Sequence, residues 1–285
     1  MAAIGDDTAG KLQARAATTA CLDGLGDNGA MPSALTVRLV GGPTAVLDYA
    51  GLRLLTDPTF DPPGEHEGGL TKLTGPAVAA DEVGAIDAVL LSHDHHADNL
   101  DPGGRAFLPR AGRTLTTTAG AERLGGNAVG LEPWATAELE RPGGGAVTVT
   151  AVPALHGPVG SEPVTGPVIG FVLTAEDAPA LYVSGDNASV DVVRAIAART
   201  GPTELAVLFC GGVSLPHRFD GAYLTLSADA AAQAAEVLGA RAVVPVHFEG
   251  WAHFTQGADD LRASFAAAGI ADRLVVPERG GSVSL

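Results

Sequence analysis

Short apolar runs alternate with turn residues along most of the chain, and this pattern predicts a protein rich in β-strands. Three β-branched and leucine-rich runs, separated by Gly-Gly-Pro and Ala-Gly, are typical of consecutive antiparallel strands: Leu35–Val40, Thr44–Tyr49 and Leu52–Thr56. Later runs of similar length predict buried strands: Ile86–Leu91, Ala146–Val152, Val168–Thr174, Ala180–Val183, Leu205–Phe209 and Ala242–Val246.

Helical stretches lie between some of these strands. The predicted helices are Asp191–Arg199, Ala228–Leu238 and Ala258–Ala268. The second follows Ser227, which can cap a helix N-terminus, and stops at Gly239, a residue typical of helix ends. Because strands occur in both meander and strand–helix–strand order, the pattern favours an α/β sandwich over a doubly wound parallel sheet.

The first 30 residues differ from the rest of the chain. Residues 1–30 lack a sustained apolar period and are rich in Ala, Gly, Asp and Thr. We therefore predict a disordered N-terminal extension over 1–30 and a single domain over 31–285. Met31, the only other methionine, stands just before the first predicted strand and is an alternative start of the chain.

Composition and charge exclude several classes of protein. Hydrophobic residues make up 46% of the chain, but no run reaches the ~18 apolar residues of a membrane span. A net charge of −16 with scattered basic residues disfavours a nucleic-acid binder. Two cysteines cannot form a disulfide framework, and Asp6 and Asp7 stand where a signal peptide would be apolar, so we expect a cytoplasmic protein. Its expected partner is a small-molecule substrate, with no nucleic acid and no membrane, and a homo-oligomer stays open.

Several predicted strands end in side chains that can bind a metal. Strand ends that share one edge of a sheet meet where ligands bind in open α/β sheets. A lone histidine or aspartate is more often structural, but three histidines and two aspartates within residues 93–98 are not typical of a solvated loop. Imidazole and carboxylate together suit Zn²⁺, Mn²⁺ or Fe²⁺, and we expect zinc above the other two. The candidate ligands are His93, His95, His96, Asp98, His156, Asp186 and His247.

Four motifs in this order resemble the metallo-β-lactamase superfamily, in particular its ascorbate-6-phosphate lactonase-like hydrolases. They are Ser-His-Asp-His-His-Ala-Asp-Asn-Leu-Asp (92–101), Pro-Ala-Leu-His-Gly (153–157), Val-Ser-Gly-Asp-Asn (183–187) and Val-Pro-Val-His-Phe-Glu-Gly-Trp (244–251). The resemblance implies a four-layer αββα sandwich with a metal cleft at one edge of two sheets. It also implies that Asp186 bridges two metals, that His156 and His247 each bind one, and that Asp57 supports the metal loop by hydrogen bonding.

The first motif departs from the family pattern His-x-His-x-Asp-His. One residue is inserted, and Asn99 stands where the pattern has a histidine. His93 and His95 point the same way on an extended chain, whereas His93 and His96 do so on a helical turn, so either His95 or His96 is the second ligand. Because an amide oxygen binds Zn²⁺ more weakly than imidazole does, we predict one tightly bound metal and a second that is weak or absent. Asn99→His should strengthen the second site.

These residues predict a metal-dependent hydrolase that uses a metal-activated water on a small-molecule lactone, ester or phosphoester. Asp98, beside the histidine ligands, is the candidate catalytic residue that orients and deprotonates the water. Arg218 can hold a substrate carboxylate or phosphate, and Tyr223 and Trp251 are further candidates for substrate binding. His253 and Phe254 follow His247 closely enough to form a wall of the pocket.

Two other functions are open on the same scaffold. The altered first motif is compatible with a non-hydrolytic protein that binds a metal to sense or carry a ligand. Iron-dependent oxidation is the third alternative. Metal analysis combined with a screen of lactones, phosphodiesters and thioesters distinguishes the three.

Overall fold

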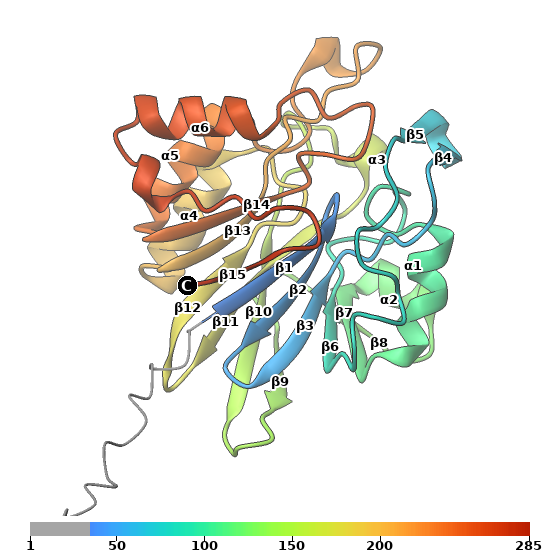
Figure 1. Cartoon of the computed structure of the whole chain (residues 1–285), viewed down its shortest axis with the longest axis vertical. Helices are drawn as coiled ribbons and strands as arrows, with labels where there is room; N and C mark the ends of the chain where they lie inside the picture. Colours follow the sequence, from blue (N-terminus) through green and yellow to red (C-terminus); the bar gives the residue numbers. More distant parts are fainter. Residues whose placement is uncertain (1–34) are drawn as a thin grey trace, which may run out of the picture. The chain divides into compact units, whose positions relative to one another are not determined.

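Two β-sheets packed face to face form the centre of the molecule, as the computed structural model shows for residues 35–285 (Figure 1). The first sheet has the strand order β15-β1-β2-β3-β6-β7-β8. Its strands are β1 (Leu35–Gly41), β2 (Thr44–Tyr49), β3 (Leu52–Thr56), β6 (Ala88–Leu90), β7 (Arg113–Thr117), β8 (Ala128–Leu131) and β15 (Ser282–Ser284). The predicted extension over 1–30 lies outside the described residues.

The second sheet has the order β14-β13-β12-β11-β10-β9. Antiparallel pairs join β9 to β12, whereas β12, β13 and β14 run parallel. In the first sheet β3, β6, β7 and β8 are parallel as well. The carboxyl ends of neighbouring parallel strands therefore meet at one edge of each sheet. The strands are β9 (Thr136–Glu140), β10 (Ala146–Pro153), β11 (Ile169–Ala175), β12 (Ala178–Val183), β13 (Leu205–Phe209) and β14 (Ala242–Val246).

Helices cover the outer faces of the strands, which completes a four-layer αββα sandwich and confirms the predicted fold class. Figure 1 shows α4, α5 and α6 on one side of the strands and α1 and α2 on the other. The helices are α1 (Pro102–Phe107), α2 (Thr118–Leu124), α3 (Glu162–Thr165), α4 (Val190–Thr200), α5 (Ala228–Leu238) and α6 (Ala258–Ala267). Single 3₁₀ turns occupy Glu67–Gly69, Leu108–Arg110, Phe219–Gly221 and Ala271–Arg273.

The period of two along the strands divides the core into two parts. Leu54 and Leu90 belong to the large core cluster, which includes residues of both sheets. Leu55 and Val89, their neighbours in the chain, point the other way and pack with Phe107 of α1. No helix in the described part of the chain is long and apolar enough to cross a membrane.

A short hairpin of β4 (Gly64–His66) and β5 (Leu70–Lys72) lies beside the first sheet. Its base is fixed by a buried ion pair of 2.9 Å between Lys72 Nζ and Asp101 Oδ2. The Asp101 carboxylate also accepts hydrogen bonds from the backbone of Phe60, Asp61 and Gly104, so it caps α1 as well. One buried carboxylate thus joins the hairpin, the loop after β3 and α1.

Candidate metal centre

Three histidines form the first cluster of candidate ligands. His93 and His96 lie in the loop after β6, and His156 follows β10. His96 Nδ1 is 2.9 Å from His93 Nε2 and 3.3 Å from His156 Nε2. The other ring nitrogen of His156 lies 2.7 Å from the Leu224 carbonyl oxygen, which can only accept, so Nδ1 carries the proton and Nε2 is free to bind a metal.

The structure decides between the two candidates in the first motif, because His96 lies in the cluster and His95 does not. His93 Nε2 lies 2.9 Å from His96 Nδ1, so the first and fourth residues of this segment face the same point. The His95 ring instead reaches the Thr165 carbonyl at 2.7 Å. His95 therefore lies outside both clusters, and its role as a metal ligand stays a prediction.

The second cluster consists of Asp98, Asp186 and His247, all of them buried. Asp186 follows β12 and His247 follows β14, two strands of the parallel part of the sheet. His247 Nε2 lies 3.4 Å from Asp98 Oδ2 and 3.8 Å from Asp186 Oδ1. The other oxygen of Asp186 is 3.7 Å from His156 Nε2, so this carboxylate lies between the two clusters. The position suits the bridging role that the family resemblance implies for Asp186.

Asp57 and Asn99 form hydrogen bonds with Asp186 and with the loop that carries the histidines of the first cluster. Asp57, at the end of β3, accepts from the Ser92 backbone at 2.7 Å and from the Ser92 hydroxyl at 2.5 Å. Asn99 Nδ2 donates to Asp57 at 2.9 Å and to Asp186 at 3.2 Å. The amide nitrogen of Asn99 therefore faces the carboxylates, whereas its oxygen has no partner among residues 35–285.

Burial keeps the imidazoles of the first cluster neutral. It lowers the pKa of His96 to about 3 and that of His156 to about 4. The pKa of His93 also lies well below its ordinary value, because of burial and the neighbouring His96. Neutral imidazole is the form that binds a metal ion, so the first cluster is ready to bind at neutral pH.

The carboxylates of the site differ in their protonation. Burial raises the pKa of Asp57 to about 7, and burial together with the charges of Asp98 and Asp57 raises that of Asp186 to about 7. Burial also opposes ionisation of Asp98, but His253 and His247 outweigh it and hold the pKa of Asp98 well below its ordinary value. Asp98 is therefore ionised at neutral pH.

The residues present fit a divalent metal ion. Three carboxylates lie buried close together, and both ring nitrogens of His247 have no hydrogen-bond partner in the described part of the chain. Carboxylates buried close together and imidazole nitrogens without a hydrogen-bond partner are costly unless a cation binds them. The combination of imidazole and carboxylate suits Zn²⁺, Mn²⁺ and Fe²⁺.

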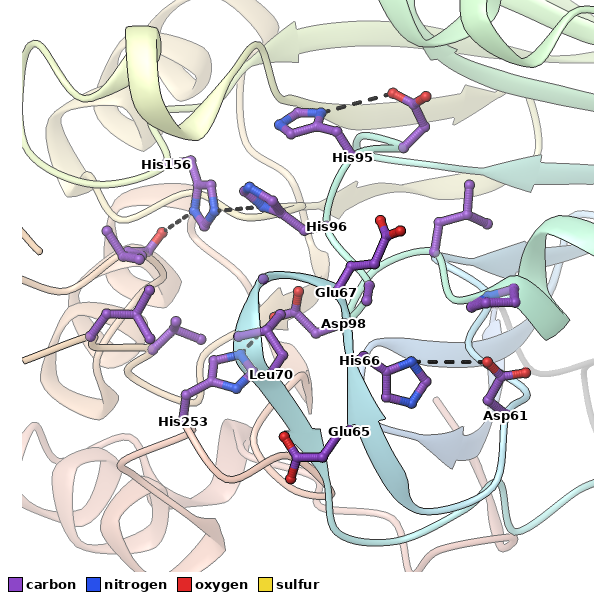
Figure 2. A pocket seen from close by; sticks show the side chains of 18 of the residues that line it. Asp61, Glu65, His66, Glu67, Leu70, His95, His96, Asp98, His156 and His253 are labelled. Carbon is purple, nitrogen blue, oxygen red and sulfur yellow. Dashed lines mark hydrogen bonds and ion pairs between the residues drawn. The ribbon is translucent and has the colours of Figure 1, made fainter. Parts of the chain in front are cut away.

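A cavity of about 870 Å³ opens above the clusters, and His96, His156 and Asp98 form part of its lining. Figure 2 shows His96 and His156 side by side, with Asp98 and His253 below them. Three acidic side chains and three guanidinium groups also line this cavity. The acidic residues are Asp61, Glu65 and Glu67, and the basic ones are Arg105, Arg123 and Arg218.

The predicted substrate-binding residues lie in different places. Arg218 is exposed and lines the cavity. Tyr223 and Trp251 are not among the lining residues of this cavity, so their contact with substrate stays a prediction. Trp251 is buried, with its ring near those of His66 and His253. His253, expected only as a wall, reaches Asp98 Oδ2 at 2.8 Å.

No motif in the sequence indicates that Arg105 and Arg123 line the cavity. Arg123 of α2 forms a two-pronged ion pair with Asp94, and Arg105 of α1 donates to the Asp94 carbonyl at 3.1 Å. The one signal in the sequence was Asp94 itself, placed between two histidines. Its partners follow it by 11 and 29 residues, and only the fold brings them to it.

These features define a protein of the metallo-β-lactamase type, and comparison with known proteins agrees. The β-lactamase superfamily domain matches residues 52–248, so the chain belongs to the metallo-β-lactamase superfamily. A UPF0173 metal-dependent hydrolase of Myxococcus xanthus is 29% identical over 70% of this chain and 69% of its own length. One from Caldivirga maquilingensis is 26% identical over 79% of this chain and 87% of its own. With the two ligand clusters, these relatives place the chain among the metal-dependent hydrolases of the superfamily.

Solved structures show the same fold. An isothiocyanate hydrolase from Delia radicum gut bacteria has a TM-score of 0.74 and 22% identity, covering 88% of this chain and 98% of that one. A metallo hydrolase from the archaeon Ignicoccus hospitalis has a TM-score of 0.67 and 18% identity, with coverage of 88% and 98%. At these identities the likeness extends to the fold alone. The ascorbate-6-phosphate lactonase-like branch stays a prediction.

Proposed function

We propose that the chain hydrolyses a small-molecule lactone, ester or phosphoester in the cavity above the two clusters. The observation that carries the proposal is the position of Asp186, with one oxygen toward His247 and the other toward His156. Such an arrangement suits two cations held by one shared carboxylate, beside a cavity of about 870 Å³ that His96, His156 and Asp98 help to line.

His93, His96 and His156 would hold one ion, and Asp98, Asp186 and His247 the other. A divalent ion held there would lower the pKa of its water to about 7 and would polarise the carbonyl or phosphoryl oxygen of the substrate. We propose zinc, because three imidazoles in one cluster are typical of catalytic zinc sites. Manganese and iron are the other ions that this donor set accepts.

Asp98 is the proposed proton acceptor. Its carboxylate lines the cavity and lies beside the imidazole cluster, whose His96 and His156 it influences electrostatically. Because His253 and His247 keep it ionised, it can accept a hydrogen bond from the attacking water and orient that water toward the substrate. Arg218, an exposed residue of the cavity lining, would hold an anionic group of the substrate.

Two neighbouring histidines provide a matched test. His96→Gln removes a proposed ligand, whereas His95→Gln removes an imidazole one residue away that lies outside both clusters. We expect His96→Gln to lose Zn²⁺ or Mn²⁺, measured as metal per chain by elemental analysis, and His95→Gln to retain it. Loss of metal from both variants, or from neither, would contradict the assignment of the site.

Activity is tested with Asp98→Ala in a screen of lactones, esters, phosphodiesters and thioesters with Zn²⁺ and Mn²⁺. The variant should fold and lose most turnover of whichever substrate the wild type cleaves. Full metal occupancy without hydrolysis of any of these substrates by the wild type would favour a non-hydrolytic protein. Oxygen uptake by an iron-loaded sample would instead indicate oxidation.

A further inference from the structure

In the second cluster the family pattern has a histidine where this chain has Asn99. His253 lies next to Asp98 of the same cluster. We propose that His253 is the residue that positions the Asp98 carboxylate for the second metal position. The inference rests on the proposed function, since it concerns how this chain holds one of the two proposed ions. His253 acts through Asp98 and is a positioning residue.

The contact between His253 and Asp98 is a short and largely buried hydrogen bond. His253 Nε2 lies 2.8 Å from Asp98 Oδ2, and the two side chains are 9% and 6% exposed. An ionised carboxylate can only accept, so Nε2 carries the proton and donates. Hydrogen bonds to a charged group are about twice as strong as neutral ones, and partners of this kind fix the orientation of metal-binding side chains.

Asn99 does not offer the second cluster a metal-binding nitrogen. Its amide nitrogen is occupied by Asp57 and Asp186, and it faces these carboxylates with a donor rather than with a lone pair. A histidine at this position would contribute a ring nitrogen to the cluster, as the family pattern has it. In the part of the chain that the structure describes, Asp98 therefore receives its imidazole contacts from His247 and His253.

The segment after β14 holds His253 in place. The backbone of Ala252 donates to the Thr71 carbonyl of the hairpin at 3.0 Å. The His253 ring packs against Phe254, at 4.8 Å between ring centroids, and Phe254 packs in turn against His247 at 4.3 Å. One segment thus carries both the metal-binding imidazole and the imidazole that positions Asp98.

Three substitutions separate positioning from packing and from direct ligation. His253→Gln can place an amide nitrogen where Nε2 stands and so keeps the donor without the imidazole. His253→Asn has the same amide on a side chain too short to reach Asp98. His253→Phe keeps a ring of similar bulk without a donor.

Binding is measured by titrating the chelator-treated full chain with Co²⁺ up to millimolar concentration, followed by visible absorption and by elemental analysis. We expect His253→Phe and His253→Asn to lower the affinity for the second Co²⁺ ion 10–100-fold, the range found for residues that orient metal ligands. The affinity of His253→Gln for this ion should stay within about threefold of that of the wild type, with an unchanged absorption spectrum of the second binding step, because the donor is retained. The first equivalent, bound by the three-histidine cluster, should be the same in all variants and reports on folding.

Other results would overturn the inference. If His253→Phe binds the second ion as the wild type does, His253 only packs. If His253→Gln loses the second ion as His253→Phe does, or changes the absorption spectrum of the second binding step, the imidazole itself is the ligand. A wild type that binds one ion but never a second overturns this inference and leaves the first cluster intact, whereas a wild type that binds none overturns the proposed function as well.

Discussion

Replacing Asp57 by asparagine should change how the stability of the metal-free protein depends on pH. Asp57 is fully buried and accepts two hydrogen bonds from Ser92 and one from Asn99. Burial raises the pKa of its carboxyl from 3.8 to about 7. The native protein therefore holds a proton on Asp57 between pH 4 and pH 7, where the unfolded chain has released it.

The sign follows from proton linkage. Where the native state binds more protons than the unfolded state, the free energy of unfolding falls as pH rises. The stability contributed by protonated Asp57 is complete below about pH 4, is lost progressively up to about pH 8, one unit above the native pKa, and changes no further above that. With these two pKa values the loss between pH 5 and pH 8 is about 2–3 kcal/mol.

The assay is urea unfolding of wild type and Asp57→Asn in the presence of a chelator, at pH 5, 6, 7 and 8. Asparagine has no proton to lose, so the wild type should become less stable relative to the variant by about 2–3 kcal/mol from pH 5 to pH 8. The buried histidines titrate in both proteins, so their contributions cancel in the difference. Loss of the Asp57 charge also lowers the pKa of Asp186, which adds to the effect in the same direction.

Asp259→Asn is the control, because that side chain is fully exposed on α6. It should leave the pH profile parallel to that of the wild type. A difference between wild type and Asp57→Asn that is constant within about 0.5 kcal/mol, or that grows in the opposite direction, would refute the reasoning.

Three further predictions follow from other contacts. Lys72→Met leaves the Asp101 carboxylate buried without its cation and should lower the free energy of unfolding in urea by about 3–5 kcal/mol. Adding Asp101→Asn to the same chain should restore part of this loss, whereas a loss below about 1 kcal/mol would contradict the importance of the pair. Asn99→His should raise the metal retained per chain after dialysis, whereas two equivalents in the wild type, unchanged by the substitution, would contradict a weak second position. Arg218→Ala should raise KM for an anionic substrate at unchanged kcat, and an equal fall in kcat and kcat/KM would instead place Arg218 in the transition state.

Much of the fold could be predicted from local pattern. The predicted strands correspond to β1, β2, β3, β6 and β10–β14, and α5 has the predicted bounds. Other elements carry weaker signals. β7 is Thr-rich and α1 contains two glycines, which are poor helix formers. Gly104 in α1 is nevertheless required, because a Cβ there would lie 1.8 Å from the Pro58 carbonyl oxygen. That contact exists only once α1 has packed on the loop after β3.

The sequence by itself determined which side chains stand at the strand ends, because the apolar period of each strand is local and the parallel strands bring their ends together. His93, His156, Asp186 and His247 could be named on that basis. Only the tertiary structure decided that His96 rather than His95 lies with His93 and His156, that Arg123 reaches Asp94 and that His253 reaches Asp98. The last two residues are 155 positions apart in the chain. Their contact depends on how two sheets and the segment after β14 pack together, and no local pattern records that packing.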